Sequence, residues 1–354
     1  MKKILVIDDS ALMRRAISDI IESTNEYCVA YSAKDGVEGL EIIENNHDIA
    51  TVFCDINMPR MSGLELLQVL KRKNIDIPIV IFSSSDDTDD TITALQLGAI
   101  EFIKKPERIL GRSSVYFEKR VMKALDIASN VQKVAPTIDN KNESKKKKSE
   151  KTNSEKKKSK KKTSKLIAVC CSTGGPRALQ SVLPYIPANI AAPIVLVQHM
   201  PVGFTGTLAE RLNELSQITV KEAENYETLK NGVCYIAKGG THLTVEEKNG
   251  VPRIVFDDSP AVVGLKPCGN IMYNSLCDLS YDEIVCVILT GMGADGTKGI
   301  LKLSQHKDVY VIAQDEKSST VYGMPKAIYE RGLTDCVCDI NSIAKEITKK
   351  VGVL

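Results

Sequence analysis

The sequence lacks an apolar run that could cross a membrane. Its 354 residues contain no uninterrupted stretch of the ~18 apolar residues that a spanning helix needs. The opening segment MKKILVIDDS also lacks the long apolar core and cleavage site of a secretory signal. We therefore expect a cytoplasmic protein, and an apolar fraction of 43% with 26% charged residues is ordinary for a globular chain.

Metal-binding and redox cysteine motifs are missing as well. None of the ten cysteines forms a C-x-x-C pair: two are adjacent at 170–171, and one residue separates Cys336 from Cys338. Reduced thiols are the expected state. Histidine is scarce, with four residues at positions 47, 199, 242 and 306, so a catalytic base of this type can be only one of four residues.

A segment without aliphatic or aromatic side chains divides the chain. Residues 141–165 contain 13 lysines and three glutamates, and their net charge of +10 leaves the remainder acidic, since the whole chain carries only +2. Such a segment cannot bury a core, so we predict a flexible linker at 131–164 between domains at 1–130 and 165–354. A solvated tether is the expected role, and attraction to an acidic partner or membrane surface is the alternative.

The first domain alternates short apolar runs with segments of helical periodicity. Strand-like runs extend from KILVID to IEFIK, and the helical patterns between them cover Ala11–Ser23, Gly36–Asn45, Gly63–Lys73 and Asp89–Leu97. This alternation predicts a doubly wound α/β fold, a parallel sheet with helices on both faces. In such a sheet the functional site lies at the carboxyl ends of the strands.

Polar side chains follow several of these strand ends. Asp8 and Asp9 close the first strand, Asp55 the third and Ser83 the fourth, and Lys105 follows the fifth. Each has another explanation when taken singly; Asp9, for example, could cap the first helix. Three carboxylates at one edge of a sheet, however, suit a hard octahedral cation such as Mg²⁺.

The motifs VIDDS, DINMPRMSGLELL, IVIFSSS and GAIEFIKKP resemble those of response-regulator receiver domains, whose fold is flavodoxin-like. The resemblance covers residues 1–125. It implies that Asp55 is the phosphoacceptor and that Asp8 and Asp9 hold Mg²⁺ beside it.

The same resemblance assigns three further receiver positions. Ser83 and Lys105 would contact the phosphoryl group, and Phe102 would be the aromatic switch position. The chemistry is consistent, because Mg²⁺ and a lysine ammonium offset the charge of a phosphoryl group in transfer.

The second domain also reads as α/β. Its strand-like runs are KLIAVCCS, APIVLVQHM, EIVCVILTG and VYVIAQD, with ITVKEA, GVCYIA, HLTVEE and PRIVF between them. Ser172, His199 and Asp295 lie at or just past three strand ends. At a shared edge they can form a relay in which the histidine takes the serine proton and the aspartate fixes the imidazole tautomer.

The stretch IAVCCSTGGP, residues 167–176, ends a strand abruptly before a helix predicted at RALQSVLPYI, residues 177–186. A strand, a sharp turn and a helix together can expose a nucleophile. Cys170 and Cys171 belong to the strand by pattern, where a thiol packs as a small apolar group. We therefore predict Ser172 as the nucleophile, with a cysteine nucleophile as the alternative.

A competing interpretation comes from GMGADG at 291–296. This is a G-x-G-x-x-G sequence between a strand and a helix, with Asp315 at the end of the next strand, as in dinucleotide-binding sites. Only 58 residues follow Gly296, which is too few for a complete dinucleotide domain of the usual order. The glycines can instead place the backbone of Met292 and Gly293 beside a reacting carbonyl.

The segments CSTGGP, VQHMPVGFTGTLAERLN, GVCYIAKGGTHL, DDSPAVVGLKP and ILTGMGADGTKG resemble the catalytic domain of chemotaxis protein-glutamate methylesterases, the CheB family. With the receiver, the resemblance covers nearly all of the chain outside the linker. It implies a Rossmann-like α/β domain and a triad of Ser172, His199 and Asp295. Thr173 and Met292 would lie near the oxyanion, and the esterase would need no cofactor.

The resemblance implies a phosphorylation-controlled hydrolase in chemotactic adaptation. Its substrates would be methyl esters of glutamates on chemoreceptors, and receptor glutamines would be deamidated because a carboxamide has the same carbonyl geometry. The chemotaxis histidine kinase would be the phosphodonor, association with receptor arrays would be peripheral, and no nucleic acid is expected. A non-enzymatic adaptor gated by its receiver is another alternative.

Two segments depart from the usual family pattern. Cys170 and Cys171 stand where Gly-Ala is usual, and LKPCGN at 265–270 stands where His-Arg-Pro-Ser-x-Asp is usual. Neither segment contains a predicted triad residue. We therefore expect the departures to affect substrate docking and the choice of receptor site rather than the reaction class.

Overall fold

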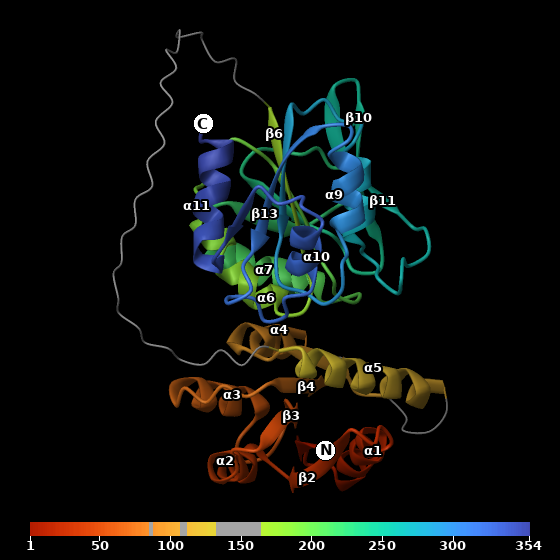
Figure 1. Cartoon of the computed structure of the whole chain (residues 1–354), viewed down its shortest axis with the longest axis vertical. Helices are drawn as coiled ribbons and strands as arrows, with labels where there is room; N and C mark the ends of the chain where they lie inside the picture. Colours follow the sequence, from red (N-terminus) through yellow and green to blue (C-terminus); the bar gives the residue numbers. More distant parts are fainter. Residues whose placement is uncertain (85–87, 107–111, 132–163) are drawn as a thin grey trace.

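The computed structural model describes residues 1–84, 88–106, 112–131 and 164–354, which form two α/β units joined in sequence by the predicted linker (Figure 1). Apart from its two end residues, the linker predicted at 131–164 lies outside the described residues. None of the helices in the described part of the chain is long and apolar enough to span a bilayer.

The first unit is a five-stranded parallel sheet in the order β2-β1-β3-β4-β5. Helices α1 and α5 pack on one face, while α2, α3 and α4 pack on the other, which confirms the predicted doubly wound fold. The strands are β1 (Lys2–Ile7), β2 (Tyr27–Ala33), β3 (Ile49–Asp55), β4 (Ile79–Ser83) and β5 (Glu101–Lys104). The helices are α1 (Ala11–Glu22), α2 (Gly36–Asn45), α3 (Gly63–Arg72), α4 (Thr88–Leu97) and α5 (Arg112–Ser129).

Side-chain caps explain where these helices begin. Ser10, not Asp9, is the N-cap of α1, and its hydroxyl accepts a hydrogen bond from the backbone N–H of Met13. Asp9 is exposed at the rim of the sheet, so its carboxylate is left for another role. Ser62 and Glu65 form a reciprocal capping box at the start of α3.

The second unit is a seven-stranded parallel sheet in the order β14-β13-β12-β6-β7-β9-β8, with a separate antiparallel hairpin of β10 and β11. Its strands are β6 (Lys165–Cys171), β7 (Ile194–Gln198), β8 (Thr219–Glu222), β9 (Val233–Ile236), β10 (His242–Lys248), β11 (Val251–Asp257), β12 (Glu283–Ile288), β13 (Asp308–Gln314) and β14 (Cys336–Cys338). Its helices are α6 (Gly175–Gln180), α7 (Thr205–Leu215), α8 (Gly269–Ser275), α9 (Thr297–Leu303), α10 (Met324–Glu330) and α11 (Ile340–Val351).

The helix predicted at 177–186 is wrong in its extent. Helix α6 ends at Gln180, and only a single 3₁₀ turn, Leu183–Tyr185, follows it. Pro184 lies inside this turn and has no backbone N–H, so it cannot continue an α-helical hydrogen-bond ladder.

The order of the strands brings distant parts of the chain to one edge. Strand β6 lies between β12 and β7, with Cys170 in register with Ile288 on one side and Val197 on the other. The three strands are parallel, so the segments that follow them emerge together at the carboxyl edge of the sheet.

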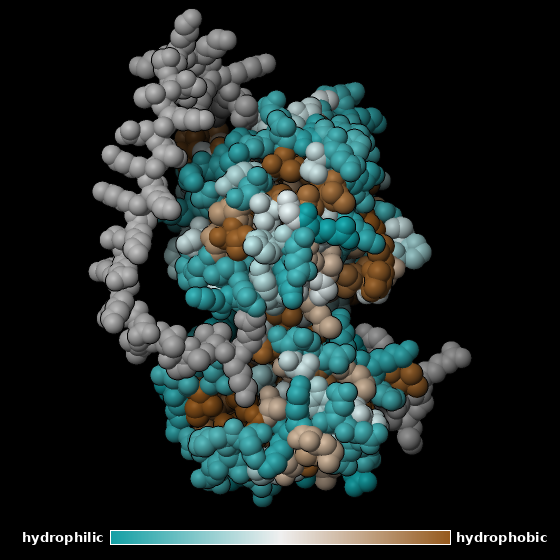
Figure 2. Space-filling view, in the orientation of Figure 1, coloured by the Kyte–Doolittle hydropathy of each residue, from teal (hydrophilic) through white to brown (hydrophobic). Residues whose placement is uncertain are grey.

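The two units pack against each other through this edge. Helix α4 of the first unit faces α6 and α7 of the second (Figure 1). The apolar cluster beneath α4 is continuous with the core of the second unit. The space-filling view shows the two lobes meeting at a waist (Figure 2).

Candidate functional site

Ser172 sits on a tight turn directly after β6. Its backbone N–H donates to the carbonyl of Thr290 at 3.0 Å, and its own carbonyl accepts from Gly175 N–H at 2.8 Å. The side-chain amide of Gln198 donates to the same carbonyl at 3.0 Å. A Cβ added to Gly175 would collide with Oε1 of Gln198, so a larger residue there would displace the side chain that holds the Ser172 carbonyl. The predicted elbow is therefore present.

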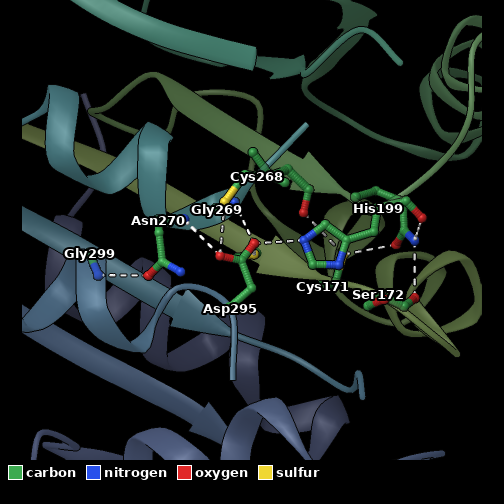
Figure 3. A network of polar contacts seen from close by, with 11 residues as sticks. Cys171, Ser172, His199, Cys268, Gly269, Asn270, Asp295 and Gly299 are labelled. Atoms are coloured by element: carbon green, nitrogen blue, oxygen red, sulfur yellow. Dashed lines mark hydrogen bonds and ion pairs between the residues drawn. The ribbon is translucent and has the colours of Figure 1, made fainter. Parts of the chain in front are cut away.

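His199 and Asp295 form a buried hydrogen-bonded pair. Nε2 of His199 lies 2.7 Å from Oδ2 of Asp295, and their side chains are 8% and 4% exposed. The imidazole lies between Asp295 on one side and Ser172 on the other (Figure 3). Since the carboxylate occupies Nε2, it fixes the tautomer in which Nδ1 keeps a lone pair and can act as a base.

The carboxylate of Asp295 is held by the start of α8. The backbone N–H groups of Gly269 and Asn270 donate to Oδ2 at 2.5 Å and to Oδ1 at 3.0 Å, and the thiol of Cys268 lies 3.2 Å from Oδ1 (Figure 3). Burial would raise the pKa of Asp295, but the hydrogen bonds from His199 and these backbone groups outweigh it and lower the pKa to about 2. Asp295 is therefore ionised at neutral pH.

The segment LKPCGN, which differs from the usual family pattern, lies closer to the predicted triad than we expected. We expected it to affect substrate docking, yet Cys268, Gly269 and Asn270 contact the predicted triad acid directly. Asn270 also accepts a hydrogen bond from Gly299 N–H at 2.7 Å, which ties α8 to α9. A helix start is a common site for a carboxylate, but the sequence alone did not indicate that this helix meets Asp295.

Thr173 and Met292, the two residues predicted near the oxyanion, lie beside Ser172. Both line the same cavity as Ser172, and neither donates its backbone N–H to another residue in the described part of the chain. The Thr173 carbonyl is fixed by the hydroxyl of Thr290 at 3.0 Å. A Cβ added to Gly291 would lie 2.8 Å from the Cβ of Ser172, so the loop of Met292 can approach only because Gly291 is small.

A cavity of about 640 Å³ opens over these groups. Its walls come from the turn after β6, the loop after β12, a loop containing Val262 and Val263, and Lys123 of the first unit. The three predicted triad residues, Ser172, His199 and Asp295, all line it. The structure therefore brings together every predicted residue of the second domain's site.

The carboxylates predicted for the first unit also converge. Oxygen atoms of Asp8, Asp9 and Asp55 lie within 4.8 Å of one another. The ammonium of Lys105 lies 2.9 Å from Asp8 and 2.6 Å from Asp55. Burial raises the pKa of Asp55 to about 6, even though Lys105 opposes the shift. Mg²⁺ prefers oxygen ligands, which these three carboxylates provide, and Asp9 is exposed to solvent.

Ser83 and Phe102 take different positions. Ser83 is buried at the end of β4, and its carbonyl accepts a hydrogen bond from the backbone of Lys105 at 2.8 Å. Phe102 instead packs on Phe204 of the second unit, with ring centroids 4.6 Å apart. The predicted switch position thus lies in the contact between the two units.

Glu101 makes a contact that no sequence signal indicated. Its Oε2 lies 3.4 Å from the hydroxyl of Thr173, the residue next to Ser172. Its other oxygen lies 3.9 Å from Arg120 of α5. A carboxylate of the first unit therefore reaches the wall of the second unit's cavity.

Both units of the chain are similar to known proteins. The family model described as CheB methylesterase matches residues 167–347, and that of the response regulator receiver domain matches residues 4–110. A protein-glutamate methylesterase/protein-glutamine glutaminase of Geobacillus kaustophilus is 38% identical over 353 residues, covering 99% of both chains. Its counterpart in Thermotoga maritima is 37% identical over 352 residues, covering 99% of this chain and 98% of that one. The crystal structure of the Thermotoga maritima CheB methylesterase catalytic domain is 40% identical, with a TM-score of 0.52, and covers 53% of this chain and 100% of that domain.

Proposed function

Because this chain belongs to the CheB methylesterase family and carries a receiver domain, we propose that it hydrolyses glutamate methyl esters of chemoreceptors with a Ser172–His199–Asp295 triad. Receptor glutamines would be deamidated at the same site, and the enzyme would work in the cytoplasm. The observation that carries the proposal is the buried His199–Asp295 pair beside Ser172 in one cavity.

In the proposed mechanism, acylation begins at Ser172. Ser172 Oγ attacks the ester carbonyl carbon while its proton passes to Nδ1 of His199. The ionised Asp295 stabilises the resulting imidazolium, and the backbone N–H groups of Thr173 and Met292 face the developing oxyanion. As the tetrahedral intermediate collapses, His199 returns the proton to the leaving methoxy oxygen, and methanol departs.

Deacylation repeats the sequence with water. His199 takes a proton from water as its oxygen attacks the acyl carbon, and then gives this proton to Ser172 Oγ. The products are the free enzyme and a glutamate carboxyl group. With a glutamine substrate the leaving group is ammonia, and the other steps are unchanged.

The receiver would accept a phosphoryl group at Asp55 from the chemotaxis histidine kinase. Asp8, Asp9 and Asp55 would hold Mg²⁺, which when bound offsets the charge of the phosphoryl group. Lys105, already within 2.6 Å of Asp55, would add its own positive charge at the same place.

Control of the esterase would operate through the contact between the units. Lys123, Glu101 and Phe102 bring the receiver to the cavity and its rim, so the closed arrangement limits access to Ser172. Phosphorylation would draw Ser83 inward and reposition Phe102. A contact weakened by a few kcal/mol would convert a mostly closed population into a mostly open one.

The decisive test measures methanol released from methylated receptor membranes. Ser172→Ala should reduce the rate by about 10⁶, because the nucleophile of a triad is lost. Cys171→Ala is the matched control and should keep most activity, since its thiol is buried and donates to Gln198. Activity that survives in Ser172→Ala but is lost in Cys171→Ala would identify a thiol enzyme instead.

A second measurement tests the control. Asp55→Asn should stay at the basal rate with kinase and ATP, while the fragment 165–354 should exceed the basal rate of the full chain. Equal rates for the fragment and the unphosphorylated full chain would mean that the receiver recruits or stimulates rather than inhibits.

The two alternatives make different predictions. A dinucleotide site at 291–296 would need its loop free for a ligand, whereas Asp295 in that loop is engaged with His199 and α8. Asp315, its expected ribose ligand, accepts hydrogen bonds from Ser318. A non-enzymatic adaptor would release no methanol. Methanol release in the first test would therefore exclude this alternative, and its absence would support it.

A further inference from the structure

Two buried thiols lie against the His199–Asp295 pair, and the proposed reaction uses neither. Cys170 Sγ is 4.0 Å from Asp295 Oδ2, the oxygen that bonds to His199. Cys268 Sγ is 3.2 Å from the other oxygen, Oδ1. One ligand atom each of Cys170, His199 and Asp295 lies within 4.8 Å of the other two.

Thiolate, imidazole and carboxylate are the ligands that bind zinc in proteins. A zinc ion about 2.0–2.3 Å from each donor would hold the donor atoms about 3.3–3.8 Å apart in a tetrahedral arrangement. The His199–Asp295 distance of 2.7 Å and the Cys170–Asp295 distance of 4.0 Å lie on either side of this spacing. Sub-ångström to ångström shifts of side chains would therefore admit the ion.

We propose that the triad of this chain also binds Zn²⁺, through Cys170, His199 and Asp295, and that the bound ion reversibly stops the esterase. Cys268 contacts the other oxygen of Asp295 and is not one of these ligands. Binding displaces the proton of the Cys170 thiol, which passes to solvent, while the ring proton of the neutral His199 imidazole moves from Nε2 to Nδ1 and leaves the Nε2 lone pair for the ion. No electron is transferred.

Inhibition follows from the nitrogen that the metal occupies. With Zn²⁺ on Nε2, the imidazole loses its hydrogen bond to Asp295, and the cation withdraws charge from the ring. Nδ1 then carries the ring proton and has no lone pair with which to take the proton of Ser172. Inhibition rests on the proposed triad, whereas metal binding does not, so the two are measured separately.

Cys171 provides a matched control within the same strand. It points to the opposite face of β6 and belongs to a different apolar cluster from Cys170. Its thiol donates to Gln198 Oε1 at 3.0 Å rather than facing Asp295. A zinc site of the proposed composition should depend on Cys170 and be indifferent to Cys171.

Binding is tested with Co²⁺ on the chelator-treated full chain, in a background where Cys336 and Cys338 are both serine. The unaltered site and Cys171→Ala should give a near-ultraviolet thiolate-to-cobalt band that Zn²⁺ abolishes. Cys170→Ala and Cys170→Ser should weaken Co²⁺ binding by roughly 100-fold or more, because a direct ligand is lost. The same band in Cys170→Ser, or none in the unaltered site, would overturn the proposal.

Inhibition is tested by titrating Zn²⁺ into the methanol-release assay, with each variant referred to its own metal-free rate. Chelator should restore activity, and the half-inhibitory Zn²⁺ concentration should rise by a similar factor in Cys170→Ala and not in Cys171→Ala. Equal half-inhibitory concentrations would show ordinary binding to His199 and contradict the proposal. A cobalt band in a chain without esterase activity would leave the site standing and refute the proposed function.

Discussion

The ring of Phe102, on the last strand of the receiver sheet, packs on the ring of Phe204 at the start of α7, with centroids 4.6 Å apart and planes inclined by 39°. Both side chains are buried, at 4% and 6% exposure. The predicted switch residue therefore contributes directly to the surface that joins the units. Any movement of Phe102 must change this contact.

Phe204→Ala should raise the methanol-release rate of the unphosphorylated chain several-fold. An aromatic pair contributes about 0.5–1.5 kcal/mol beyond its buried area, and losing it shifts the closed population towards the open one. The rate is measured without kinase, beside that of the phosphorylated enzyme, which should change little. Tyr226→Ala, which removes an exposed ring that packs on Arg253, is the control. An unchanged basal rate in Phe204→Ala would show that this contact does not restrain the enzyme.

Asp55→Asn should raise the melting temperature of the receiver at pH 7–8, and the gain should shrink as the pH falls to 5. The folded-state pKa of Asp55 is about 6, above its ordinary value of 3.8, so the charged form opposes folding at neutral pH. Protonation below pH 6 removes this cost in the unaltered chain. The difference between the two pKa values corresponds to a gain in the free energy of unfolding of at most about 3 kcal/mol. The loss of the ion pair with Lys105 in the variant reduces this gain. A difference that is constant from pH 5 to 8 would contradict the expectation.

Gly269→Ala should lower the methanol-release rate and destabilise the second unit. The new Cβ would lie 2.4 Å from Cys170 Sγ and 3.1 Å from Asp295 Oδ2, so α8 or Asp295 must move. Overpacking of this kind typically costs about 1–3 kcal/mol. Cys170→Gly in the same chain removes the nearer atom and should restore part of both properties. Failure of the double substitution to recover anything would place the defect elsewhere.

Asp295→Asn should reduce the free energy of unfolding by about 2 kcal/mol at neutral pH. The folded-state pKa of Asp295 is about 2 against an ordinary 3.8, so its charge stabilises the fold above pH 4. That contribution is lost as the pH falls from about 4 to 2. Denaturant unfolding of both chains at pH 7, 4 and 2.5 should therefore show a converging difference. Curves that stay parallel down to pH 2.5 would mean that the carboxylate is not preferentially ionised in the fold.

Much of both sheets could be predicted from the sequence, because strand periodicity is local and parallel strands end at one edge. This rule was enough to predict that Ser172, His199 and Asp295 lie close together, and all three line one cavity. The contacts that were missed depend on how preformed elements pack. The approach of α8 to Asp295 follows from the packing of the second unit. Likewise, the meeting of Glu101 with Thr173 depends on the docking of two separate surfaces.

The position of β12 between β6 and β13 has a consequence for synthesis. Ser172 and His199 leave the ribosome long before Asp295, yet β6 needs β12 beside it to complete its hydrogen bonding. A nascent chain that ends before residue 283 therefore presents an unpaired edge of a largely apolar strand, which other chains can extend into aggregates. The emergence of β12 closes this edge, and Asp295, the proposed acid of the triad, follows shortly after it. If the proposed triad is correct, the enzyme becomes active only after this edge is covered.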